Sequence, residues 1–202
     1  MDARQASQTL EVIRTLMERA TQYQLLTARA GMVAGSLAGA GALSFLILHP
    51  ADPGQSGVVW ALVFAGSLLA TCLGTVLRGR EVGEQVWSRQ ARTVVAALTP
   101  SLAAAAVLTV FFFAHGMHLW LPGVWMLCYG QGAMATASYA PPAIRAVGIT
   151  ALIIGPVTLL LGPDFGVLMM GLMFGVGHIA LGAALLAFER QQSAIRLHRE
   201  VA

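Results

Sequence analysis

The side chains best suited to chemistry lie near the middle of two long apolar stretches. His178 lies near the centre of one stretch, and Cys128, Tyr129 and Gln131 lie near the centre of another. Polar groups at that depth in a membrane are costly unless they have a partner. Gln131 and His178 have the same expected depth, so the sequence predicts a hydrogen bond between them. These four residues form a candidate polar pocket, with simple interhelical hydrogen bonding as the alternative.

A second group of candidate residues is the loop sequence His115-Gly116-Met117-His118. Thioether and imidazole ligands together suit Cu(I), so His115, Met117 and His118 are weak candidates for a metal site. Counted along its own helix, His178 lies about 20 Å below the end of the bundle at which this loop is expected. One haem cannot bridge that distance, so His178 cannot share a haem with His115 or His118. We therefore expect no cofactor.

The chain shows no set of residues typical of an enzyme. It has no Ser/His/Asp arrangement, no glycine-rich phosphate loop and no pair of carboxylates within the apolar stretches. Asp52 and Asp164 lie alone between apolar stretches. Intramembrane hydrolysis or acyl transfer needs several ionisable groups in the apolar region, and His178 alone qualifies. We expect the protein not to be an enzyme.

These residues must be positioned by helices within a membrane. Hydrophobic residues make up 57% of the 202 residues and charged residues 10%, which excludes an ordinary soluble domain. Each apolar stretch is long enough to cross a hydrocarbon core of about 30 Å as a helix. The sequence predicts an all-α bundle of six transmembrane helices, at 28–49, 58–77, 93–114, 119–140, 142–162 and 165–188.

The arginines predict the orientation of this bundle. All 12 basic residues are arginines, and they occur only at the two termini and at the second and fourth gaps between stretches, with Arg29 and Arg145 in the first turn of the adjoining span. Positive charge accumulates on the cytoplasmic side of membrane proteins, so both termini are expected in the cytoplasm. The net charge of +3 then reflects topology and contact with the lipid bilayer, and we expect no nucleic-acid partner.

The flanking segments are polar. Residues 1–27 are predicted to form an amphipathic cytoplasmic helix, which lies in the headgroup layer, on the bundle or on a protein partner. Residues 28–188 form the transmembrane domain, and residues 189–202 a cytoplasmic tail. The segment Arg78–Arg92 is expected to form a short interfacial helix.

Glycines at four-residue spacing predict close helix packing. They occur in three stretches, either as contacts within one chain or as the seam of a homodimer. Prolines inside the third and fifth stretches, Pro100 and Pro156, are candidate kinks or hinges. The packing glycines are Gly31, Gly35, Gly39, Gly66, Gly74, Gly171 and Gly175.

Three strings of residues carry a resemblance to known proteins. They are Leu10-Glu11-Val12-Ile13-Arg14-Thr15-Leu16-Met17-Glu18-Arg19, Leu121-Pro122-Gly123-Val124-Trp125-Met126-Leu127-Cys128-Tyr129-Gly130 and Phe174-Gly175-Val176-Gly177-His178-Ile179. Together they resemble a family of small, uncharacterised bacterial membrane proteins with six spans. The resemblance implies a bacterial inner-membrane protein, and it carries no activity that can be transferred.

Three functions stay open at this point. The first is a membrane component for interaction, sensing or regulation, with a cytoplasmic protein partner or a second copy. The second is a small-molecule permease or ligand-binding bundle around His178. The third is a redox protein that binds a metal or haem.

Overall fold

The computed structural model describes residues 10, 27–48, 53–83, 85–187 and 190, and every regular element among them is helical. The helix predicted for residues 1–27 and the tail predicted for 189–202 lie outside this part, apart from Leu10, Thr27 and Arg190. The helices are α2 (Ala28–Leu48), α3 (Pro53–Val82), α4 (Arg89–Ala114), α5 (Leu121–Thr136), α6 (Pro142–Leu161) and α7 (Gly166–Met170). The last helix continues through a π-helical segment, Gly171–Val176, to residue 187.

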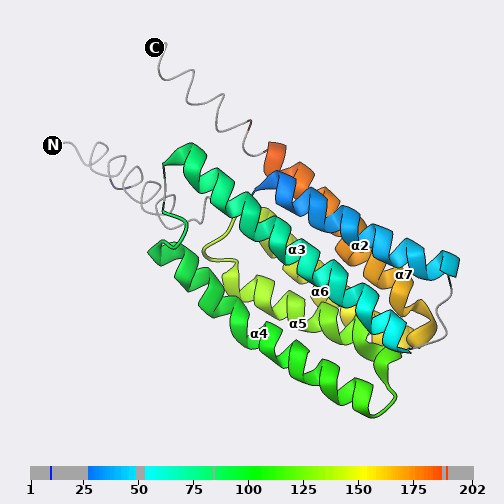
Figure 1. The fold of residues 1–202 in the computed structure, drawn as a ribbon. Coiled ribbons are helices and arrows are strands. Elements are labelled where there is room, and N and C mark those ends of the chain that lie inside the picture. Colours follow the sequence, from blue (N-terminus) through cyan, green and yellow to red (C-terminus); the bar gives the residue numbers. More distant parts are fainter. Residues whose placement is uncertain (1–9, 11–26, 49–52, 84, 188–189, 191–202) are drawn as a thin grey trace.

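Five of the described helices are long and apolar enough to cross a membrane, as expected for an integral membrane protein. The helix α5 is shorter than its predicted span of 119–140. Its 16 residues extend about 24 Å, and a short 3₁₀ helix, His118–Trp120, precedes it. Even so, α5 lies in the middle of the bundle between α4 and α6 (Figure 1).

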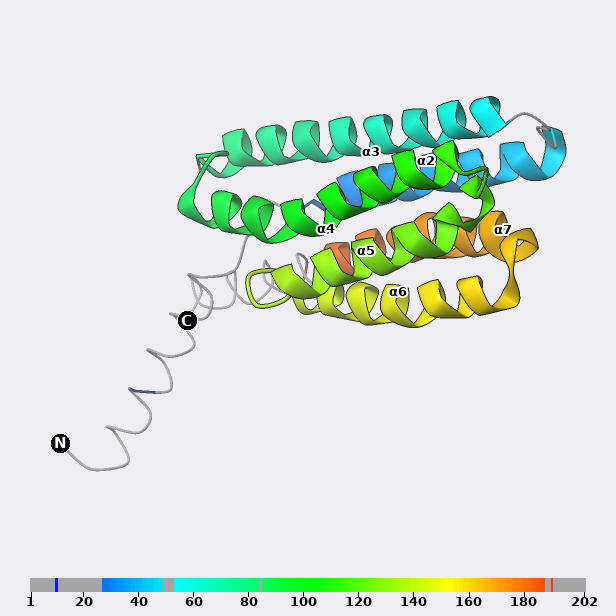
Figure 2. The same ribbon diagram turned by 90° about the horizontal axis from the view of Figure 1, so that it is seen from below.

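The helices form two layers of three. In one layer α2 packs between α3 and α7, and in the other α5 packs between α4 and α6. Figure 2 shows α4, α5 and α6 in front, with α2 and α7 behind them. The layers meet where α5 and α6 contact the last helix, around the buried side chains of Met126, Ala151 and Met173.

Glycines bring α2 close to its two neighbours. A Cβ placed on Gly31 would lie 3.4 Å from the Cα of Gly182, and one on Gly35 would lie 2.7 Å from the carbonyl oxygen of Gly175. A Cβ on Gly175 would lie 3.1 Å from the Cα of Gly39. The glycines of the first span therefore meet those of the last span within one chain, and a dimer seam is not needed to account for them.

The remaining predicted packing glycines also lie against α2. A Cβ on Gly66 would meet Leu37, one on Gly74 would meet Thr27 and Ala30, and one on Gly171 would meet Ala42 at 2.7 Å. The sequence analysis overlooked a further glycine contact, between α5 and α6. There a Cβ on Gly123 would lie 3.1 Å from the Gly155 carbonyl, and one on Gly130 would lie 3.1 Å from the Gly148 carbonyl.

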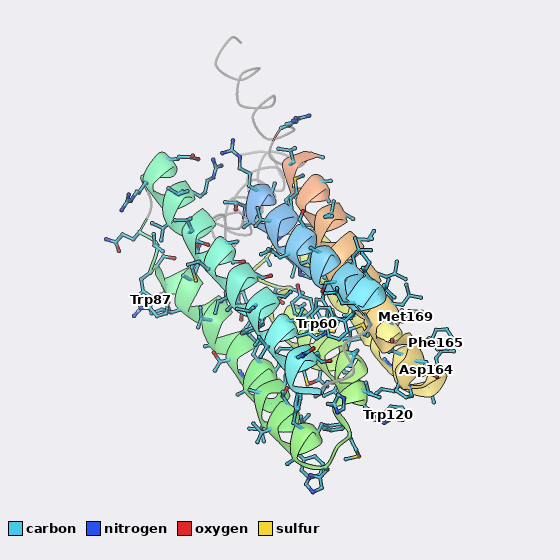
Figure 3. All side chains as sticks on the ribbon, turned by 45° about the vertical axis from the view of Figure 1, so that its right-hand side comes forward. Trp60, Trp87, Trp120, Asp164, Phe165 and Met169 are labelled. Carbon is cyan, nitrogen blue, oxygen red and sulfur yellow. The ribbon has the colours of Figure 1, made fainter. Side chains whose placement is uncertain are left out.

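The two ends of the bundle differ in chemistry. The described arginines all lie at the end where α2 begins and α3 ends. Figure 3 shows Trp87 at this end, and Trp120, Asp164 and Phe165 toward the opposite end. Because successive helices are antiparallel, every described arginine lies at one end of the bundle. The positions of the arginines at the termini and at the second and fourth gaps predict this.

The connection at the arginine end corrects one prediction. The segment Arg78–Arg92 forms no separate interfacial helix in its described residues, because α3 continues to Val82 and α4 begins at Arg89. Gly83, at a φ of +69°, turns the chain at the end of α3, a conformation that favours glycine. The Ser88 hydroxyl then caps α4 by accepting a hydrogen bond from the Ala91 N–H at 3.2 Å.

Candidate functional site

A hydrogen bond between Tyr129 and His178 joins the two layers inside the bundle. The Tyr129 hydroxyl lies 2.9 Å from Nε2 of His178, and both side chains are partly buried. Tyr129 lies at the middle of α5, and His178 lies two residues after the π-helical segment of the last helix. The bond therefore links the most buried helix of one layer to an irregular segment of the other.

The second ring nitrogen of His178 is left without a partner. Its Nδ1 atom is buried and makes no hydrogen bond within the described residues. The backbone of Met173 lies near this imidazole but outside hydrogen-bond geometry with Nδ1. Buried polar atoms without partners are rare in folded proteins, and each one points to strain, function or an additional bound group.

The tautomer of His178 is taken as the one that leaves the fewest buried polar groups without a hydrogen bond. If the Tyr129 hydroxyl donates to Nε2, the only unsatisfied group is an Nδ1–H donor. If Nε2 donates instead, the Tyr129 proton and the Nδ1 lone pair both lack partners. The first arrangement leaves fewer buried groups unsatisfied, so His178 presents an N–H donor to the interior of the bundle.

Aromatic rings surround this hydrogen bond. The Tyr129 and Phe174 rings lie edge to face with their centroids 5.2 Å apart, and the Phe174 and His178 rings are 5.7 Å apart. Met126 and Met173 pack against the same group and are almost fully buried. The site therefore combines one polar pair with an apolar and aromatic lining, as small-molecule sites commonly do.

The π-helical segment lies directly before His178. The backbone N–H of Gly177 donates to the carbonyl of Leu172, five residues earlier, instead of four as in an α-helix. Such segments occur often at functional sites because they turn side chains away from regular α-helical positions. The glycines Gly171, Gly175 and Gly177 are the signal in the sequence, although Gly171 and Gly175 were interpreted only as packing residues and Gly177 was not singled out.

The predicted hydrogen bond between Gln131 and His178 is wrong. Tyr129 occupies Nε2 of His178, and the Gln131 side chain is exposed on the opposite side of α5. Two residues along a helix turn the side chain by about 200°, so Tyr129 and Gln131 cannot face the same neighbour. Gln131 and His178 were predicted at the same depth, but the orientation of α5 about its own axis turns Gln131 away from His178.

Cys128 is also separate from the Tyr129–His178 pair. It packs with Ala105 of α4 and Val124 in another buried cluster. Both cysteines are free, and Cys72 is exposed whereas Cys128 is buried. Of the four predicted pocket residues, the structure brings together Tyr129 and His178.

The weak metal candidates lie in a loop at the end opposite the arginines. His115 Nδ1 lies 2.8 Å from the Phe111 carbonyl, and the His118 ring stacks on Phe113 with centroids 5.6 Å apart. Met117 is exposed. Across the described residues no three His, Cys, Asp or Glu side chains gather to hold a metal ion.

Trp125 has a role that the sequence analysis missed. Its Nε1–H donates to the hydroxyl of Thr109 in α4 at 3.0 Å. Its ring also lies 5.4 Å from the ring of Phe64 in α3. Trp125 thus joins three helices beside the interior site.

Comparison of the chain with protein-family models, curated proteins and solved structures found no match. Its function must therefore be argued from the site itself.

Proposed function

We propose that this chain is a non-enzymatic integral membrane protein that senses a small molecule at the Tyr129–His178 pair. The observation that carries the proposal is the buried Nδ1 of His178, which has no partner within the described residues. An ionisable side chain inside a membrane bundle is by default a candidate functional site. The proposal places the protein in a bacterial inner membrane, with the arginine-bearing end in the cytoplasm.

The chemistry of the site favours one kind of ligand. An N–H donor inside an aromatic lining suits a small apolar molecule that carries a hydrogen-bond acceptor, such as a carbonyl, ether or hydroxyl oxygen. The side chains around the pair, Phe174, Met126 and Met173, are uncharged. A charged ligand would lose its hydration there without an ionic partner.

The position of His178 also favours a sensing role. Its carbonyl oxygen lies 3.5 Å from the Cβ position of Gly31, at the close contact between α2 and the last helix. A ligand that moves His178 would therefore act directly on the packing of the first span. That span is preceded in sequence by the polar segment 1–27, which we propose as the contact surface for a cytoplasmic protein partner.

Native mass spectrometry of the full chain, gently extracted from its own membrane, tests this proposal. The expected result is a reproducible small added mass on the wild-type protein that is absent from His178→Ala. His115→Ala is the matched control, because His115 is exposed at one end of the bundle and should leave the added mass unchanged. If wild type and His178→Ala carry identical masses, the sensing proposal fails.

A small-molecule permease is the second candidate, and a specific observation favours it. The two-layer bundle contains Pro100 in α4, Pro156 in α6 and the π-helical segment in the last helix. Three such irregularities in one bundle suit a protein that changes shape. Uptake into vesicles that depends on His178, with unchanged protein stability, would favour the permease over the sensor.

A further inference from the structure

Gln131 is a polar side chain on the outer surface of the bundle, near the middle of its length. It is exposed, and it makes no hydrogen bond within the described residues. Gly130 and Gly132, on either side of it, face Leu152 near the middle of α6 and Leu98 near the middle of α4, so Gln131 lies level with the middle of the neighbouring helices. In a membrane that these helices span, that level is within the hydrocarbon core.

The other faces of α5 are already occupied. Gly132 faces Leu98 and Ser101 of α4, whereas Gly130 faces Leu152 of α6. Tyr129 faces the last helix. The remaining face carries Gln131 and Ala135, which are both exposed, and we call it the Gln131 face.

Four other polar side chains in the long helices are satisfied within their own helices. The hydroxyl groups of Ser36, Thr71, Thr99 and Thr158 each donate to a backbone carbonyl four residues earlier, at 2.7–2.9 Å. Gln131 makes no such bond, and its carboxamide has two donors and one acceptor oxygen. Hydrocarbon cannot satisfy these groups, so an exposed Gln131 is unfavourable unless another polypeptide covers it.

We propose that the Gln131 face is the contact between two copies of this chain. A two-fold axis along the membrane normal brings the two Gln131 side chains together at the same depth, because symmetry requires it. Each carboxamide then donates to the oxygen of the other. An unrelated partner would need a polar residue of its own at that depth.

The shape of the Gln131 face suits this contact. Ala135 has a small side chain, which allows two helices to approach closely, and the turn that follows α5 exposes the small side chain of Ser138. Because α5 is the middle helix of its layer, the contact is central to one broad side of the bundle, as Figure 2 shows for α4, α5 and α6. The dimer contact is distinct from the Tyr129–His178 pair, so it does not depend on the proposed function.

Dimerisation of the full chain in lipid vesicles, measured by single-molecule photobleaching over a range of dilutions, tests the proposal. Two amide hydrogen bonds between membrane helices predict a roughly tenfold weaker dimer for Gln131→Ala. Thr99→Ala is the matched control, since the Thr99 hydroxyl is exposed but already bonded to the Val95 carbonyl at 2.7 Å. Thr99→Ala should dimerise as the wild type does.

A cysteine cross-link locates the contact. In a chain carrying Cys72→Ser and Cys128→Ala, Gln131→Cys is expected to form a disulfide-linked dimer on oxidation. Leu160→Cys, on an α6 side chain that is 87% exposed, should not. The proposal is overturned if the wild type stays monomeric at every dilution, if Gln131→Ala dimerises equally well, or if position 131 cross-links to a different protein instead.

Discussion

The contact between α2 and the last helix predicts opposite effects on stability for alanine at Gly35 and alanine at Gly39, which lie one helical turn apart. A Cβ added at Gly35 would lie 2.7 Å from both the carbonyl oxygen of Gly175 and the backbone nitrogen of Ile179. That is about 0.8 Å inside the ~3.5 Å separation at which nonbonded atoms attract. Backbone atoms cannot rotate away as a side chain does, so the two helices must separate. A Cβ at Gly39 instead points into open space, with nothing within 4 Å.

The magnitudes follow from these distances. Overpacking a tight contact costs about 1–3 kcal/mol, and the backbone clash places Gly35→Ala near 3 kcal/mol of lost unfolding free energy. Gly39→Ala relieves the low helix propensity of glycine without a clash. It should therefore change the unfolding free energy by between zero and about +1 kcal/mol.

Unfolding of the full chain by sodium dodecyl sulfate in detergent micelles, followed by tryptophan fluorescence, is a suitable assay. The Trp125 side chain contacts Thr109 of α4 and Phe64 of α3, so its fluorescence is expected to change when the bundle unfolds. The two alanine variants differ in position but not in chemistry, so each serves as the control for the other. The packing argument is refuted if both variants lose the same stability, or if Gly35→Ala is as stable as the wild type.

Two further predictions concern Trp125 and the cysteines. Trp125→Phe and Thr109→Val each remove the Trp125–Thr109 hydrogen bond and should each cost about 1 kcal/mol of unfolding free energy or more, with the double variant costing less than the sum. Because Trp125→Phe removes the fluorescent reporter, these variants are unfolded by the same detergent and followed by circular dichroism; full additivity would show that the bond contributes nothing. A small apolar maleimide should label Cys72 well before Cys128 in the folded protein, because Cys72 is exposed and Cys128 is buried. Cys72→Ser should then abolish the fast labelling measured by intact mass, whereas equal labelling rates would contradict the burial of Cys128.

Much of the fold could be predicted from local sequence. The long apolar stretches and the sorting of arginines are properties of short segments, and membrane insertion responds to them one segment at a time. The described helices α2, α4, α5 and α6 begin and end within about four residues of the predicted spans, whereas α3 extends five residues beyond its predicted span at each end. The ends of α3 are polar, so apolar composition alone does not mark where that helix begins and ends.

The sequence also identified the residue types of the site but not their partners. His178 was singled out because an imidazole inside a span is costly wherever it points. Its hydrogen-bond partner depended on the rotation of α5 about its axis, which composition does not determine. A turn of about 100° per residue separates Tyr129, which faces the last helix, from Gln131, which faces outward.

Hydrophobicity and charge along the chain thus determined that this is a helical membrane protein with its arginines at one end. Tertiary packing decided which glycines meet and which ring nitrogen of His178 has no partner. The physical reason is that insertion depends on the summed properties of each segment, whereas packing depends on which side of each helix meets a neighbour. In a span that is apolar all round, little in the sequence distinguishes one side from another.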